Sequence, residues 1–281
     1  MKVTIVGHGF VGKAIENGLN NNVQTLIIDP IYKKEISEII SFNPEVIFIS
    51  VPTPMRKDGD QDLTILKKVI EEIVSIGTNA EVVIKSTVLP NNISIIEKMI
   101  PSIVYNPEFL TEKNAFEDFI NADLNVFGGN EKNVSKIVSF YKNNTKCLLN
   151  DYIVTDLVSA SLIKYTINTF LASKVIFFNE LQKLFNKSGT TETWENFIKA
   201  ISLDSRIGKS HMKVPGPDGR YGFGGACFPK DSQALYQYSL SQEEPLHMLK
   251  KVIDLNNKIR SSYDSINDRE IDQNITFSTK E

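Results

Sequence analysis

The sequence has 281 residues, of which 41% are hydrophobic and 23% are charged. Its 31 Lys and Arg nearly balance 34 Asp and Glu, so the formal net charge of -3 indicates no basic surface for nucleic acid or anionic lipid. No apolar run approaches the length of a membrane span, and the first apolar strand begins at Val3, so we expect no signal peptide. Two cysteines do not make a disulfide framework, which favours a cytoplasmic protein with a thiol available for chemistry.

Short runs rich in Val and Ile alternate with helical patterns in the first half of the chain. The predicted strands are Val3–Val6, Thr25–Ile28, Val46–Val51, Val82–Ile84, Leu124–Phe127 and Cys147–Leu149. The predicted helices are Gly12–Asn20, Ile31–Ile40, Leu63–Ile76 and Glu131–Tyr141. This alternation, with nearly continuous apolar strands, predicts an α/β domain over residues 1–150 whose parallel sheet is covered on both faces.

The second half carries helical patterns only. Asp156–Asn186 has apolar residues at helical spacing, and a loop rich in Gly and Pro follows from Val214 to Pro229. A further helix is predicted over Asp231–Ile259, with an interruption near Pro245. We therefore expect an all-helical domain over residues 151–260 and a polar, poorly ordered tail over residues 261–281.

A glycine motif follows the first predicted strand directly. Gly7-His8-Gly9-Phe10-Val11-Gly12 connects that strand to a predicted helix, which is the context in which G-x-G-x-x-G binds a dinucleotide. Asp29 ends the next strand, where a carboxylate can bond the adenosine ribose and repel the 2′-phosphate of NADP. These features predict an NAD-binding Rossmann-like domain; the alternative is a structural turn with an Asp cap.

Three further segments of the first domain need a common explanation, Val51–Pro54, Lys85–Pro90 and Asn106–Leu110, and the first two of them follow predicted strands. The first two must lie at the carboxyl edge of the sheet, which is where open α/β sheets bind ligands. Hydroxyls and prolines at such positions form rigid polar walls. By themselves these segments predict only a binding cleft.

Cys227 lies in the segment Gly222-Phe223-Gly224-Gly225-Ala226-Cys227-Phe228-Pro229-Lys230-Asp231. A thiol after a run of glycines is closely approachable, and Lys230 together with a helix N-terminus near Asp231 would favour thiolate. Lys164 and Asn168 are four residues apart on the long helix and share one face. They form a candidate oxyanion site, or else part of a solvated polar stripe.

Taken in order, these motifs resemble the UDP-glucose/GDP-mannose dehydrogenase family over roughly residues 1–260. The segments that carry the resemblance are Gly7–Gly12, Val51–Pro54, Ser86–Val88, Asn106–Leu110, Lys164–Asn168 with Phe170–Ala172, Asp204–Gly208 and Gly222–Asp231. The last of these is highly specific. The resemblance implies a Rossmann-like domain followed by an all-helical domain for dimerisation and substrate binding.

The resemblance also implies a four-electron oxidation of a sugar 6-hydroxyl, with NAD as the cofactor and no metal ion. Cys227 would hold the aldehyde as a thiohemiacetal and then as a thioester. Lys164 and Asn168 would stabilise oxyanions, and Asp231 or Glu108 would act as base through a water that Thr87 also holds.

Contacts to the two ligands follow from the same resemblance. The residues implied for NAD are Gly7, Gly9, Phe10, Val11, Gly12, Asp29, Lys34, Pro52, Thr53, Ser86, Thr87, Glu112 and Lys230. The residues implied for the nucleotide sugar are Glu108, Phe109, Leu110, Lys164, Asn168, Arg206, Tyr221, Phe223, Gly224 and Gly225. UDP-glucose is the default sugar, ahead of UDP-N-acetylhexosamines and GDP-mannose.

The sequence departs from the family pattern at several places, among them Ser161 and a short stretch before Val46. Residues Gly216–Tyr221 look like an insertion, in which Arg220 could supply nucleotide contacts, and the sequence ends before the usual second nucleotide-binding domain. We expect a homodimer built on the long helices, with Arg206 reaching the neighbouring site, because a monomer would expose an apolar stripe. The stripe consists of Leu235, Leu246, Leu249, Val252, Ile253 and Leu255. Two alternatives are a two-electron β-hydroxyacid-type dehydrogenase and a non-catalytic NAD-binding protein.

Overall fold

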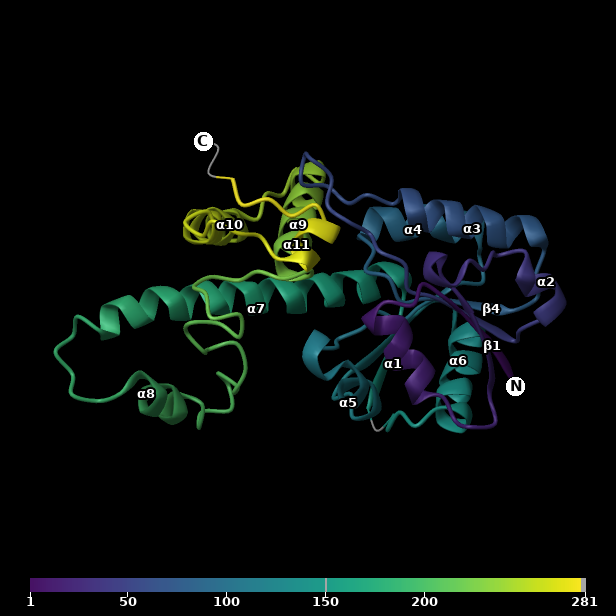
Figure 1. Ribbon diagram of the computed structural model, residues 1–281, viewed down its shortest axis with the longest axis horizontal. Coiled ribbons are helices and arrows are strands. Elements are labelled where there is room, and N and C mark those ends of the chain that lie inside the picture. Colours follow the sequence, from purple (N-terminus) through teal and green to yellow (C-terminus); the bar gives the residue numbers. More distant parts are fainter. Residues whose placement is uncertain (150, 279–281) are drawn as a thin grey trace. The chain divides into compact units, whose positions relative to one another are not determined.

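A mostly parallel sheet of seven strands organises the first part of the chain in the computed structural model, which describes residues 1–149 and 151–278 (Figure 1). The strands are β1 (Lys2–Val6), β2 (Gln24–Ile28), β3 (Val46–Ile49), β4 (Glu81–Ile84), β5 (Val104–Tyr105), β6 (Asn125–Gly128) and β7 (Tyr152–Thr155). Their order is β2-β1-β3-β4-β5-β6-β7, and β5 pairs with β6 in the antiparallel direction. The predicted α/β class is confirmed.

Helices cover both faces of this sheet, as the nearly continuous apolar strands predicted (Figure 1). The helices are α1 (Phe10–Gly18), α2 (Glu38–Phe42), α3 (Thr64–Ile76), α4 (Pro90–Met99), α5 (Ala115–Ile120) and α6 (Glu131–Asn144), with the 3-10 turns η1 (Pro30–Tyr32) and η2 (Glu112–Asn114). One apolar core, with Leu66 and Ile93, lies under α2, α3 and α4. The other, with Ile15 and Ile137, lies under α1, α5 and α6.

Two sequence predictions in this region were wrong or incomplete. Cys147–Leu149 is not a strand; the seventh strand is Tyr152–Thr155, which pairs with β6 through residues that are mostly β-branched or aromatic. The helix predicted over Ile31–Ile40 is two short pieces, η1 and α2. Lys33 adopts a left-handed conformation after η1, which interrupts a continuous helix there.

The chain divides into two compact units. The first comprises residues 1–53 and 62–164, and the second comprises residues 54–61 together with the chain from residue 165 onward. The boundary falls inside α7 (Leu157–Phe185), so the first turns of this helix belong to the first unit.

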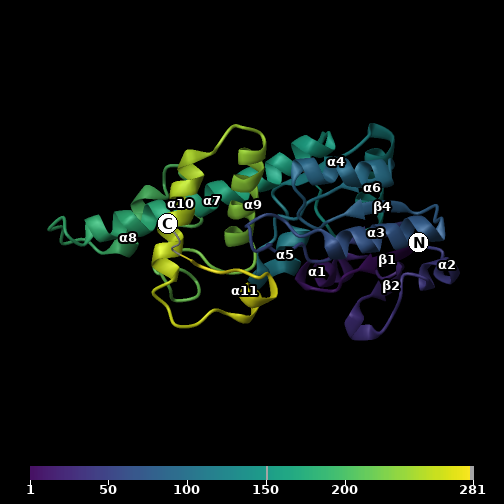
Figure 2. The ribbon, with the colours of Figure 1, turned by 90° about the horizontal axis from the view of Figure 1, so that it is seen from above.

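The second unit is helical, in agreement with the fold class predicted. Besides most of α7 it contains α8 (Trp194–Ile201), α9 (Phe228–Ser241), α10 (His247–Arg260) and α11 (Asp268–Asp272). α9 and α10 are separated at Pro245, as predicted, and both are labelled with α7 in Figure 2. The three helices share a core that includes Ile176, Phe228 and Val252. α8 packs its Trp194 against the later part of α7.

This packing overturns the expected exposed stripe. Leu235, Leu249, Val252 and Ile253 are all buried, because α9 and α10 place them against other parts of the second unit; only Leu246 of the six is largely exposed. The exposed apolar side chains of this unit instead include Phe170, Phe177 and Met248. The apolar surface available to a partner is therefore a different one from that predicted.

The segment from residue 261 to 278, predicted to be a poorly ordered tail, contains α11. This short helix begins with a capping box in which Asn267 and Glu270 exchange side-chain-to-backbone hydrogen bonds. Glu270 and Ile275 are buried. Polar composition was a poor guide here, because the polar side chains of this segment are used in buried contacts.

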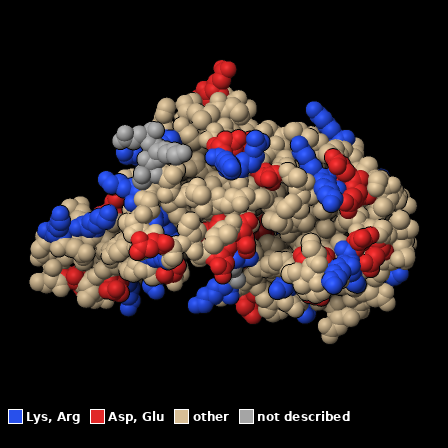
Figure 3. All heavy atoms as spheres, turned by 45° about the horizontal axis from the view of Figure 1, so that its top comes forward, with Lys and Arg blue, Asp and Glu red and all other residues tan. Residues whose placement is uncertain are grey.

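Charged side chains are interspersed in sign on the face shown in Figure 3, in keeping with the nearly balanced composition. Within the described ranges, no helix combines the length and the apolar character that crossing a bilayer requires.

Candidate active site

The glycine motif lies where β1 passes into α1. A side chain at Gly12 would place its Cβ 2.2 Å from the carbonyl oxygen of Gly7, so the close passage of helix against turn requires glycine there. At Gly9, by contrast, a Cβ would meet nothing within 4 Å, and α1 begins at that point without a side-chain cap. Open space at a helix N-terminus is what a pyrophosphate needs, so these residues fit a dinucleotide.

Asp29 is fixed beside this turn. Its Oδ2 accepts the backbone N–H of His8 at 2.7 Å, and its Oδ1 accepts that of Ile31 at 3.1 Å. Each carboxylate oxygen has two lone pairs, so both oxygens can also accept a ribose hydroxyl. Asp29 is therefore held beside the glycine turn, with both oxygens still able to accept.

The carboxyl ends of β3 and β4 are joined by two hydroxyl groups. Thr53 Oγ1 donates to the carbonyl of Thr87 at 2.9 Å, and Ser86 Oγ donates to the carbonyl of Val51 at 2.7 Å. These hydroxyls, which the sequence analysis placed against NAD, therefore hold the two loops together. Thr87 itself is half-buried, and Pro52, which precedes Thr53, is exposed.

The other residues implied for NAD vary in setting. Phe10 and Val11 begin α1 and are half-buried, and Lys34 is exposed beyond η1. Glu112 begins η2, but its side chain lies outside the part of the chain that the structure describes.

Glu108 and Lys164 form a buried ion pair in the first unit. Lys164 Nζ lies 2.5 Å from the backbone oxygen of Glu108 and 3.1 Å from its Oε1, and the two side chains are 3% and 7% exposed. Glu108 Oε2 accepts the backbone N–H of Leu110 at 2.8 Å, and Lys164 Nζ lies 5.3 Å from the ring centroid of Phe109. The ammonium group thus contacts Glu108 and lies near the ring of Phe109, while the Leu110 amide holds the Glu108 carboxylate.

A second buried lysine, Lys85, was not assigned to the site from the sequence. Lys85 Nζ donates to Asn106 Oδ1 at 2.8 Å, and the hydroxyl of Tyr141 donates to the same oxygen at 2.6 Å. Burial lowers the pKa of Lys85 to about 7, against the attraction of Glu108 that raises it. Its position in the sequence could have indicated burial, because Lys85 directly follows the apolar run of β4.

The thiol and its neighbours lie in the second unit. Cys227 is the residue that caps the N-terminus of α9, and it is half-buried. Asp231, one turn later, is 1% exposed; its Oδ2 accepts from Asn168 Nδ2 at 2.6 Å and its Oδ1 from Lys230 Nζ at 2.5 Å. The structure therefore brings together Asn168, Asp231 and the helix end that carries Cys227, and Lys230 is engaged by Asp231.

The residues implied for the sugar nucleotide fall into both units. Phe223 is buried in the second unit, Gly224 and Gly225 are half-buried, and Tyr221 is partly exposed. Arg206 is exposed and pairs with Asp204 on its own loop. Arg220 donates to the backbone and hydroxyl oxygens of Ser265, so its guanidinium has a structural role in the inserted loop.

Both units match domain models of one family. Residues 15–144 match the NAD binding domain of the UDP-glucose/GDP-mannose dehydrogenase family, and residues 158–258 match its central domain. The first domain is therefore an NAD-binding domain.

Proteins of this family are also similar along nearly the whole chain. A UDP-glucose 6-dehydrogenase of Rickettsia bellii is 35% identical over 84% of this chain and 62% of its own length. A UDP-glucose 6-dehydrogenase of Rickettsia prowazekii is 31% identical over 93% of this chain and 68% of its own length. The chain thus spans less than two thirds of the length of the first of these relatives.

Solved structures give the same fold. A UDP-glucose dehydrogenase from Pyrobaculum islandicum matches with a TM-score of 0.76 and 26% identity, over 92% of this chain and 68% of that one. A 3-hydroxyisobutyrate dehydrogenase from Mycobacterium tuberculosis matches with a TM-score of 0.73 over 98% and 96% of the two chains, but at 15% identity this is a likeness of fold alone.

Proposed function

Because the chain belongs to the UDP-glucose/GDP-mannose dehydrogenase family, we propose that it oxidises a nucleotide sugar at C6 to the uronic acid, with NAD as the hydride acceptor in each of two oxidations. UDP-glucose is our choice of substrate, since the relatives described above are UDP-glucose dehydrogenases. The observation that carries the proposal is the thiol of Cys227 at the N-terminus of α9, with a buried carboxylate one turn beyond it.

The first role of the protein is to retain the aldehyde that forms when the 6-hydroxyl loses a hydride and a proton. The thiolate of Cys227 adds to the aldehyde carbon, a C–S bond forms, and the oxygen takes up a proton to give a thiohemiacetal. The partial positive charge at the N-terminus of α9 favours the thiolate form. A second loss of hydride and proton converts this adduct to a thioester.

Hydrolysis then releases the product. Water adds to the thioester carbon, the C–S bond breaks, the thiolate of Cys227 is regenerated, and the sugar leaves as a carboxylate. We assign Asp231 as the base that takes the proton of this water, because it shares the first turn of α9 with Cys227. Glu108, with Thr87, is the alternative base.

Negative charge develops on the sugar oxygen in the tetrahedral states of both steps. Asn168 donates one amide hydrogen to Asp231, and its second hydrogen can be given to such an oxygen. Lys164 supplies a buried positive charge whose position is fixed by Glu108. Held groups of this kind stabilise a transition state without having to reorganise.

Replacement of the thiol tests this proposal. A Cys227→Ser variant should form no uronic acid, because an alcohol is a weak nucleophile at neutral pH and an alkoxide is a poor leaving group. Product analysis of the reaction of the variant with UDP-glucose and NAD would detect the acid. Formation of acid by Cys227→Ser at a nearly normal rate would contradict the thioester route. Cys147→Ser, which replaces the other cysteine, is the matched control.

The proposed assembly is a homodimer that uses a groove in the second unit. This groove has a volume of about 470 Å³ and is bordered by Phe170 and Phe177 of α7, by Arg206 and Ile207, and by Met248 of α10. Phe170, Phe177 and Met248 are 64%, 59% and 70% exposed. Three large apolar side chains around one groove favour burial by a second copy, which would also bring Arg206 of that copy to a shared surface.

A further inference from the structure

The loop that leads to Cys227 is held by side chains. Residues 221–225 belong to no helix or strand, so their backbone N–H groups need other partners. The N–H of Tyr221 donates to the hydroxyl of Tyr263, and that of Gly222 donates to Asn179 Oδ1 at 2.9 Å. The N–H of Gly225, two residues before the thiol, donates to Glu270 Oε1 at 3.0 Å.

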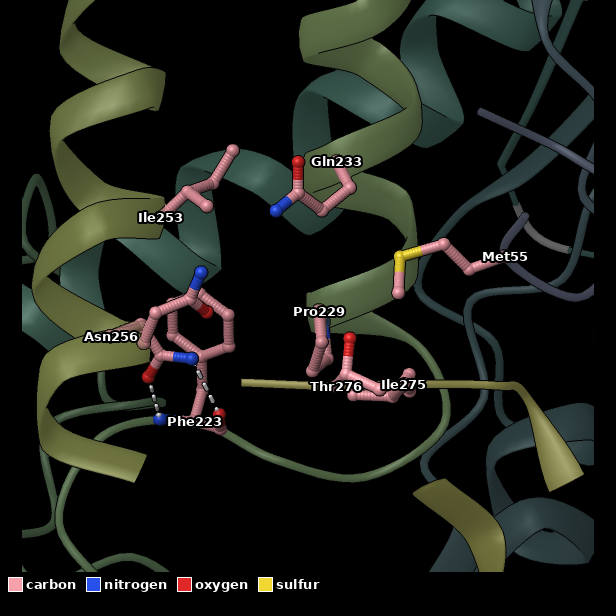
Figure 4. Close-up of a pocket in the computed structure, with 9 residues that line it drawn as sticks. Met55, Phe223, Pro229, Gln233, Ile253, Asn256, Ile275 and Thr276 are labelled. Carbon is pink, nitrogen blue, oxygen red and sulfur yellow. Dashed lines mark hydrogen bonds between the residues drawn. The ribbon is translucent and has the colours of Figure 1, made fainter. Parts of the chain in front are cut away.

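Asn256 of α10 holds the middle of this loop. Its Oδ1 accepts the N–H of Phe223 at 2.7 Å, and its Nδ2 donates to the carbonyl of the same residue at 2.9 Å (Figure 4). Beside this contact lies a small hollow with room for about one water, bordered by Pro229 and Ile275. The loop is thus fixed on both sides of Gly224 by α10 and by the C-terminal segment.

Glu270 is the buried charged residue that holds this loop. Its carboxylate is fully buried and accepts from Arg260 Nη2 at 3.0 Å as well as from Gly225. Arg260 is also buried, and its Nη1 donates to Asp218 at 2.7 Å. A buried carboxylate without such partners would strongly destabilise the folded state. The Glu270 and Arg260 side chains are therefore held in place by their need for each other.

Gly224 shows how closely the loop approaches this pair. A Cβ at Gly224 would lie 2.2 Å from both Arg260 Nη2 and Glu270 Oε1. No side chain fits there, so the backbone itself lies on the ion pair. The family model ends at residue 258, so Arg260 and Glu270 both lie beyond the region that it matches.

We propose that Glu270, fixed by Arg260, is a positioning residue that holds the thiol of Cys227 at the N-terminus of α9 through the Gly225 amide. The segment from residue 261 to 278 then contributes to the site by holding the loop that carries Cys227. This inference rests on the proposed function for its effect on turnover, but not for its effect on the reactivity of the thiol.

Two conservative variants separate the hydrogen bond from the charge. Glu270→Gln keeps an oxygen that can accept from Gly225 and loses the charge. Glu270→Asp keeps the charge for Arg260 but withdraws the carboxylate by about 1.5 Å, one C–C bond, from the Gly225 amide. Glu244→Gln, an exposed glutamate of the same unit, is the control, and thermal unfolding confirms that each variant is folded.

The measurement is the rate at which iodoacetamide alkylates Cys227 without substrate, followed by peptide mass spectrometry at pH 7 and at pH 9.5. The ratio of the two rates reports the thiolate fraction independently of access. We expect this ratio to fall about two- to five-fold in Glu270→Asp, the size of a helix-terminus effect, and to stay near wild type in Glu270→Gln. With UDP-glucose and NAD, kcat should fall more than KM rises in Glu270→Asp alone.

An unchanged ratio in Glu270→Asp, or a larger effect in Glu270→Gln than in Glu270→Asp, would overturn the positioning role. Because alkylation requires no turnover, this outcome is distinct from a failure of the proposed reaction. If the alkylation ratio falls as expected while no variant and no wild type oxidises UDP-glucose, the positioning role stands and the substrate assignment fails.

Discussion

Lys164 and Glu108 are joined by two contacts, because the ammonium group of Lys164 binds both the backbone oxygen and the carboxylate of Glu108, at 2.5 Å and 3.1 Å. Both side chains are buried in the first unit. The pair keeps a positive charge in a fixed position away from bulk water, where its effect on a developing oxyanion is largest.

Replacing Lys164 with Ala should therefore lower kcat about 10²-fold or more, while KM for the nucleotide sugar changes less, because the charge acts on the transition state. Steady-state kinetics with UDP-glucose would measure this, and Lys174→Ala, a partly exposed lysine of the same helix, is the control. A change in KM alone would show that Lys164 is a binding contact.

The cofactor preference depends on Asp29. Since its carboxylate lies beside the glycine turn, the extra phosphate of NADP would meet a negative charge there, so kcat/KM should favour NAD. Asp29→Asn keeps an acceptor for only one of the two backbone amides, of His8 and Ile31, that the carboxylate holds, and it removes the charge, so it should reduce this preference. A wild-type enzyme that preferred NADP would show that Asp29 does not face the ribose.

Lys85 gives a prediction about stability and pH. Its pKa is about 7 in the folded chain and 10.5 as the ordinary value, so between these limits the unfolded chain binds a proton that the folded chain does not. Stability should therefore rise with pH across this window, with a slope of up to about 1.4 kcal/mol per pH unit from this group.

The difference between wild type and Lys85→Met isolates this contribution. The urea midpoint of wild type should rise relative to that of Lys85→Met between pH 7 and pH 9.5, whereas Lys68→Met, an exposed lysine of the same unit, should follow wild type. Midpoints of wild type and Lys85→Met that change in parallel would mean that Lys85 is charged throughout this range.

The proposed dimer predicts a dependence on Phe177. A glutamate in place of this exposed side chain would bring a charge into the groove, so Phe177→Glu should be monomeric at micromolar concentration where wild type is a dimer. Light scattering would measure the mass, with Ile40→Glu, an exposed apolar position of the first unit, as control. A monomeric wild type that still turns over would refute the dimer.

How much the sequence could predict depends on the range of the interactions involved. The central strands and the long helix were predictable because their apolar patterns are local, and the glycine motif and Cys227 because each stands in a recognisable context. The seventh strand was misplaced by a few residues because Tyr152–Thr155 is largely exposed and its apolar run is only three residues long. The buried contact between Glu270 and Gly225 was missed for another reason. The two residues are 45 positions apart in the sequence, and a charged side chain with no partner nearby in the sequence is normally predicted to be exposed.

Counting the NADH formed for each sugar consumed tests the central claim most directly. With limiting UDP-glucose and excess NAD, absorbance at completion should correspond to two NADH per sugar, because the thiol of Cys227 retains the aldehyde until its second oxidation. One NADH per sugar would instead indicate a two-electron dehydrogenase of the β-hydroxyacid kind. No NADH, from a folded protein that binds NAD, would indicate a non-catalytic binding protein.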